Sequence, residues 1–137
     1  MNSAKSIAIV WIDDKAETTT VARQMMKKLQ QQGKKVQEVF FSMDETNEEA
    51  LNIKDFSWLG AAKSEQAKAL EQADFDLLIC LSTDLPLPMK QMVALSKAHF
   101  KIGWNSELFD MQIATDEVPS PRYLAEQITI YLEMINK

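Results

Sequence analysis

The sequence predicts an α/β domain with a mainly parallel five-stranded sheet between two layers of helices, of the Rossmann-like or flavodoxin-like kind. Residues 75–104, FDLLICLSTDLPLPMKQMVALSKAHFKIGW, read as strand, polar turn, helix and second strand, the order of one βαβ unit. Every position from 77 to 81 is apolar, which is typical of a strand covered by helices on both faces. Strand-like and helix-like segments alternate along the chain, so we expect a three-layer doubly wound fold.

The first half of the chain is expected to hold two strands and a long helix. A β-branched run at residues 6–12 predicts the first strand, and an acidic turn then leads into a helix over residues 18–32. Val21, Met25 and Leu29 form the buried stripe of this helix, and Gly33 ends it. Residues 36–42 predict a second strand, whose early alternation places it near the sheet edge. We interpret the acidic residues 43–52 as a loop.

The second half predicts three more strands and three helices. Ser64 is expected to cap a short helix that ends near residue 73, before the central strand at residues 76–81. Pro88 opens a helix over residues 88–98, and residues 100–104 and 109–115 predict the last strands. Ser120 with Pro121 is a capping signature for the closing helix. The residues expected on its buried face are Leu124, Ile128, Tyr131 and Ile135.

This order of elements predicts a single domain over residues 1–137, with the strand order 2-1-3-4-5. Composition narrows the function classes. A formal net charge of −5 with interspersed signs provides no basic face, so we do not expect nucleic acid as a partner. No apolar run is long enough to cross a bilayer, and the single cysteine, Cys80, falls inside the central strand. We therefore expect a cytoplasmic protein without a membrane partner.

Ligands of such sheets bind beyond the carboxyl ends of the strands, at the switch point between the first and third strands. The residues expected near that cleft are Asp13, Asp14, Ser82, Thr83, Asp84, Asn105, Ser106 and Asp116. The chain has three glycines, and none lies in the first strand-to-helix turn, which disfavours dinucleotide and phosphate-loop binding. Two aspartates at that turn would also repel a phosphate.

Asp13, Asp14 and Asp84 are the candidate metal ligands, because converging carboxylates suit Mg²⁺. The run AIVWIDDKAE resembles the start of response-regulator receiver domains, in which an acidic pair after the first strand helps to bind magnesium, and FDLLICLSTDLP resembles their third strand. The phosphoacceptor of that family would fall near Leu81, and FDMQIATDE carries no lysine, so phosphotransfer is not expected. Surface aspartates of ordinary turns are the competing interpretation.

Two further resemblances concern the fold. FDLLICLS and FKIGW are similar to the N-terminal domain of heptosyltransferase-type glycosyltransferases, which implies a shared half-fold and no activity. From residue 55 onward the segments DFSWLG, FDLLICLS, ALSKAHFKIGW and YLEMIN are similar to those of a small uncharacterised bacterial family, a domain of unknown function. That resemblance implies a Rossmann-like fold and no known substrate, cofactor or catalytic residue.

These observations favour a non-catalytic binding or interaction module, whose partner is a protein or a small molecule, over an enzyme. The alternative is a magnesium-dependent activity, or a vestigial transferase or receiver-like domain, that uses the acidic cluster at the strand ends. No other cofactor is expected. A third interpretation is a homodimer formed through Trp58, Phe56 and the apolar surface around Trp104.

Overall fold

The structure, a computed structural model, describes residues 5–13, 16–42, 50–51, 64–83, 85–104, 106 and 108–135. Its strands are β1 (Ser6–Ile12), β2 (Lys35–Phe41), β3 (Leu77–Cys80), β4 (Phe100–Trp104) and β5 (Met111–Ile113). Its helices are α1 (Ala16–Gln31), α2 (Glu65–Gln72), α3 (Leu87–Leu95) and α4 (Pro121–Ile135). Within the described ranges, no helix has the length and apolarity that crossing a bilayer requires.

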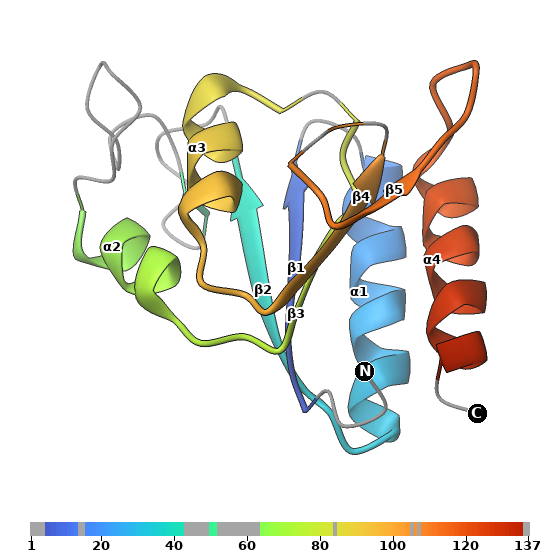
Figure 1. The fold of residues 1–137 in the computed structure, drawn as a ribbon, viewed down its shortest axis with the longest axis horizontal. Helices are drawn as coiled ribbons and strands as arrows, with labels where there is room; N and C mark the ends of the chain where they lie inside the picture. Colours follow the sequence, from blue (N-terminus) through green and yellow to red (C-terminus); the bar gives the residue numbers. More distant parts are fainter. Residues whose placement is uncertain are drawn as a thin grey trace.

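The five strands form one sheet in the order β2-β1-β3-β4-β5, and every pair of neighbours is parallel. Figure 1 shows the sheet between two layers, with α1 and α4 on one side and α2 and α3 on the other. The predicted α/β class and the order 2-1-3-4-5 are thus confirmed, and β2 lies at an edge as its alternation indicated.

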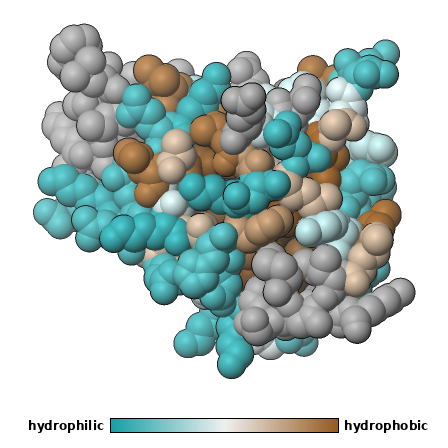
Figure 2. Space-filling view, viewed as in Figure 1, coloured by the Kyte–Doolittle hydropathy of each residue, from teal (hydrophilic) through white to brown (hydrophobic). Residues whose placement is uncertain are grey.

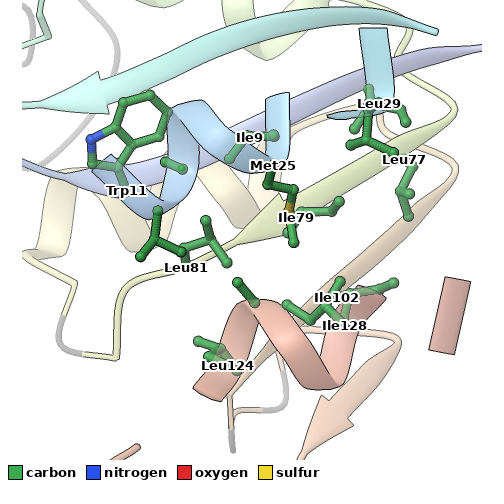
Figure 3. Close-up of a cluster of buried hydrophobic side chains, with 14 of the residues drawn as sticks. Ile9, Trp11, Met25, Leu29, Leu77, Ile79, Leu81, Ile102, Leu124 and Ile128 are labelled. Carbon is green, nitrogen blue, oxygen red and sulfur yellow. The ribbon is translucent and has the colours of Figure 1, made fainter. Parts of the chain in front are cut away.

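Two hydrophobic cores lie on the two faces of the sheet. Successive side chains of a strand point to opposite faces, so Ile7, Ile9 and Trp11 enter the core beneath α1 and α4, and Ala8, Val10 and Ile12 enter the core beneath α2 and α3. The other residues labelled in Figure 3 belong to the first core and come from β3 and the residue after it, Leu81, and from β4, α1 and α4: Met25, Leu29, Leu77, Ile79, Ile102, Leu124 and Ile128. This double burial is the pattern expected of a central parallel strand.

The polar signals that predicted helix ends act as expected. Gly33 has a φ of 84°, and the N–H groups of Gly33 and Lys34 donate to the carbonyls of Gln30 and Leu29, which is a Schellman ending of α1. The hydroxyl of Ser64 accepts a hydrogen bond of 3.0 Å from Ala67 N at the start of α2. Ser120 Oγ accepts a hydrogen bond of 3.1 Å from Tyr123 N at the start of α4. Both serines therefore cap their helices.

Other element boundaries were predicted wrongly. α3 ends at Leu95 and not at residue 98, because Ser96 has extended backbone and its hydroxyl accepts a hydrogen bond from Ala98 N. β5 covers only Met111–Ile113 of the predicted 109–115. Phe109 belongs to the preceding connection and is buried, so its apolar side chain supports the core without being part of a strand.

The connection between β4 and β5 is short for two parallel strands. Only three residues of each strand are paired, and Met111 lies opposite Ile102. After Trp104 the connection therefore has to run back along β4 by the length of about two residues, roughly 7 Å, before β5 begins. The ring of Phe109 fills the space beside Gly103, where an added Cβ would lie 2.3 Å from Phe109 Cε2. Asp110 Oδ2 accepts a hydrogen bond of 2.8 Å from Lys101 N and fixes the other end of the connection.

Residues 43–49 and 52 of the predicted loop lie outside the described residues. Ala50 and Leu51 are buried, and Leu51 forms an isolated parallel bridge with Phe41. Leu51 N donates to Phe40 O, and Ser42 N donates to Leu51 O. The chain thus touches the edge of β2 at Leu51 and extends its hydrogen bonding by one residue.

Asp76 joins the amino ends of β1 and β3. Its Oδ2 accepts hydrogen bonds of 2.8 Å from Lys5 N and 3.1 Å from Ser6 N. These two backbone donors hold the pKa of the Asp76 carboxyl below its ordinary value. The carboxylate therefore satisfies N–H groups at the start of β1 that lie 70 and 71 residues away in the sequence.

We predict that Asp76→Asn lowers the free energy of unfolding at neutral pH. Because the folded-state pKa is below the unfolded value of about 3.9, this stabilisation is fully present above that pH and is lost as the pH falls through the folded-state pKa. Thermal melts should show a constant gap in Tm between parent and variant from pH 7 to about pH 5, and a closing gap below about pH 4. Asp116→Asn, at an exposed turn, is the control and should show no such gap. A pH-independent gap for Asp76→Asn contradicts the prediction.

Candidate functional site

The expected cleft lies at the carboxyl ends of β1 and β3, where two predicted residues come together. Ser82 Oγ accepts a hydrogen bond of 2.8 Å from Ile12 N, so Ser82 joins the end of β3 to the end of β1. On the other side, Asp13 N donates to Phe41 O at 2.8 Å and joins β1 to β2. Asp13 is exposed, whereas Ser82 is half-buried and engaged with the backbone. The switch point is therefore bridged by protein hydrogen bonds.

Thr19 in α1 orients Asp13. Its hydroxyl donates to Asp13 Oδ1 at 2.7 Å and accepts from Trp11 Nε1 at 3.0 Å. Trp11 is fully buried and stacks on Phe40 with ring centroids 5.1 Å apart. A buried indole N–H needs an acceptor, and Thr19 provides it. The chain of bonds from Trp11 through Thr19 to Asp13 connects the core to the exposed carboxylate.

Ser106 and Asp116, two other predicted cleft residues, belong to turns after β4 and β5 and not to the group of hydrogen bonds around Asp13. Ser106 accepts a 3.3 Å bond from Leu108 N within its own turn after β4, and Asp116 is exposed after β5. Thr83 is half-buried beyond β3. The indole of Trp104 donates 2.7 Å to Thr115 Oγ1, and its ring packs partly on the first core. The predicted site residues that lie outside the described part of the chain are Asp14, Asp84, Asn105, Phe56 and Trp58.

This end of the sheet is where the sequence predicts a metal site. Among the described residues, no three His, Cys, Asp or Glu side chains are grouped closely enough to hold a metal ion. Asp14 and Asp84 lie outside the described residues, so the magnesium site stays a prediction. The thiol of Cys80 lies in the sheet, and burial raises its pKa to about 12, so it is a poor nucleophile.

A second polar cluster, which the sequence did not indicate, lies at the amino ends of the strands. His99 Nε2 contacts Asp74 Oδ1 at 2.7 Å, and His99 Nδ1 lies 3.8 Å from Asp76 Oδ1. His99 N also donates to Phe75 O, which places the residue at the start of β4. The three side chains connect the segment before β3 with the start of β4, which indicates that they stabilise the fold.

A third feature is an open apolar strip on α4, which we call the α4 stripe: Tyr123, Ile130 and Met134. Their exposed fractions are 44%, 50% and 65%. The opposite face of the helix buries Leu124, Ile128 and Leu132 in the first core. Figure 2 shows apolar surface over α4 at the right of the view and over the β4–β5 edge in the middle. α4 is therefore apolar on two faces, and only one of them is covered.

A groove of about 400 Å³ runs between α1 and α4 beside the α4 stripe. Its apolar lining includes Val21, Met25, Ala125 and Ile130. Its charged lining is Lys28, Arg122, Glu126 and Glu133. A signal for this face exists in the sequence: positions 123, 127, 130 and 134 form a second helical stripe beside the buried one, and three of the four residues are apolar.

A family model matches residues 1–135, and its description is a family of unknown function (DUF6913). No curated protein and no solved structure matches the chain. The match covers the sheet and the helices α1 to α4 of the described residues. It agrees with the resemblance to a domain of unknown function and brings no residue roles with it.

We predict that Thr19→Val lowers the free energy of unfolding by about 1–3 kcal/mol, because it leaves the buried Trp11 N–H without its acceptor. Thr20→Val is the matched control, since Thr20 is exposed on the same turn of α1, and it should change stability by less than about 0.5 kcal/mol. Urea unfolding measures both. Equal losses for the two variants would show that helix propensity, and not the Trp11 bond, is responsible.

Proposed function

The chain belongs to DUF6913, a family of unknown function. We propose that it is a non-catalytic interaction module that binds a protein partner through the α4 stripe. The observation that carries the proposal is the exposure of Tyr123, Ile130 and Met134 along one line of a helix whose other face is already buried. A helix that is apolar on two faces is typical of one covered on both.

Energetics support this surface as a binding face. Fully burying a large apolar side chain is worth about 1.5–3 kcal/mol relative to leaving it in water, and this gain is open to a partner at three positions of α4. Isolated exposed apolar residues are ordinary on a protein surface. Leu87 and Leu95 on α3 are of that isolated kind, because eight residues of helix separate them by about 12 Å along the axis and about 80° around it.

The hydroxyls at the carboxyl end of the sheet also favour binding over catalysis. Ser82 Oγ is bonded to Ile12 N, and Thr19 Oγ1 is bonded to both Trp11 and Asp13. Each of the two hydroxyl oxygens already accepts a hydrogen bond from a protein N–H group, which makes it a weaker nucleophile. We further propose a cytoplasmic location, which the unpaired and buried Cys80 supports.

A second candidate function, a magnesium-dependent or receiver-like activity, is favoured by one observation. Asp13 is exposed directly after β1, at the switch point of the confirmed strand order, and Thr19 fixes one of its carboxylate oxygens. Asp13 with Asp14 and Asp84 would then bind the cation through oxygen ligands.

The first candidate is tested by affinity capture with the purified chain as bait, from a lysate of its own organism. We expect Ile130→Glu to lose the proteins that the parent retains, because a charge in the stripe opposes burial. Leu95→Glu, which places the same charge on an exposed α3 position, should retain them. Melting curves check that both variants fold. Retention of the same proteins by Ile130→Glu contradicts the proposed face.

The second candidate is tested by thermal melts with and without millimolar Mg²⁺. A ligand that binds only the folded state stabilises it, by about 2.7 kcal/mol at one hundred times its Kd. Under the magnesium hypothesis the parent gains stability, and the double variant Asp13→Asn, Asp14→Asn gains none. An unchanged Tm for the parent argues against the cation site.

A further inference from the structure

We propose that the partner of the α4 stripe is a second copy of this chain, which packs its own α4 antiparallel across it in a two-fold symmetric dimer. The inference rests on the proposed interaction function and names its partner. Two observations carry it: the spacing of the apolar residues along α4 and the placement of the charges that flank them.

The apolar residues are self-complementary in an antiparallel pair. Positions 123, 130 and 134 are separated by seven and four residues, so they share one face of the helix. A two-fold axis at the midpoint between Ile128 and Thr129 places Tyr123 opposite Met134 of the second copy, because the two positions are equally far from that midpoint. Gln127 and Ile130 are paired by the same symmetry. An isologous interface requires this kind of self-matching.

Two of the three charged α4 residues that line the groove are self-complementary as well. Arg122 and Glu133 are both exposed, and both line the groove on the α1 side of the helix. A two-fold axis keeps the α1 sides of the two helices on the same side of the interface and reverses their direction. Arg122 therefore meets Glu133 of the second copy at one end, and the opposite pair forms at the other end. In a parallel two-fold arrangement the α1 sides of the two helices would lie on opposite sides of the interface, and Arg122 would not meet Glu133 of the second copy.

Side-chain chemistry fits a reversible contact. Tyr is enriched among residues that dominate binding energy, and Met adapts its shape to irregular surfaces. A contact centred on one helix of 15 residues lies at the small end of dimer interfaces. We therefore expect a dimer with a Kd on the order of micromolar, populated at high protein concentration.

Sedimentation velocity of the purified chain from about 1 to 500 μM tests the proposal, with the range chosen to bracket a micromolar Kd. The expected result is a concentration-dependent shift from 15.6 kDa to twice that mass. Ile130→Glu should remain monomeric throughout, and Leu95→Glu should dimerise like the parent. A parent that stays monomeric, or a dimer that survives Ile130→Glu, overturns the proposal.

Charge reversal tests the antiparallel geometry separately. Arg122→Glu and Glu133→Arg should each raise the Kd about tenfold, since each change removes two symmetric ion pairs and introduces like charges. The double variant should restore the parent Kd. Failure of that rescue overturns the arrangement. The experiments distinguish failure of the dimer from failure of the interaction function. If the parent stays monomeric but captures a different protein through α4, the dimer is wrong and the interaction function is supported.

Discussion

The burial of β1 on both faces and both edges is the constraint on which the rest of the molecule depends. β1 pairs with β2 on one edge and β3 on the other, and its residues from Ile7 to Ile12 alternate between the two cores. A shift of one residue would exchange the two sets of side chains, so the register is held by both helix layers at once. Hydrogen bonds from Ser6 N to Asp76 and from Ile12 N to Ser82 join the two ends of β1 to the ends of β3 and complete the alignment of the two strands.

Much of this fold could be predicted because its signals are local. Gly33, Ser64 and Ser120 satisfy helix ends within a few residues, and the apolar run of β3 identifies a strand in the middle of the sheet. The errors occurred where a contact distant in sequence or a side chain outside any regular element decides the outcome. Phe109 has the character of a strand residue, yet its burial results from its position beside Gly103.

The candidate site was predictable in position and not in detail. Parallel topology places Asp13 and Ser82 at the same end of the sheet, as we expected. The role of Thr19 was not predicted, because it depends on where the indole of Trp11 points, and that direction is set by packing in the core. The α4 stripe was overlooked for another reason. Its period was visible beside the buried one, but a sequence does not say which of two apolar helix faces the core will cover.

The place of β3 between β1 and β4 has a consequence for synthesis on the ribosome. β1, α1 and β2 emerge first, but the second edge of β1 pairs with residues 77–80, which are made later. Until those residues leave the exit tunnel, a nascent chain carries an apolar strand with one open edge, which is a template for pairing with other chains. Protection from aggregation during translation thus depends on a four-residue strand made after the first 76 residues.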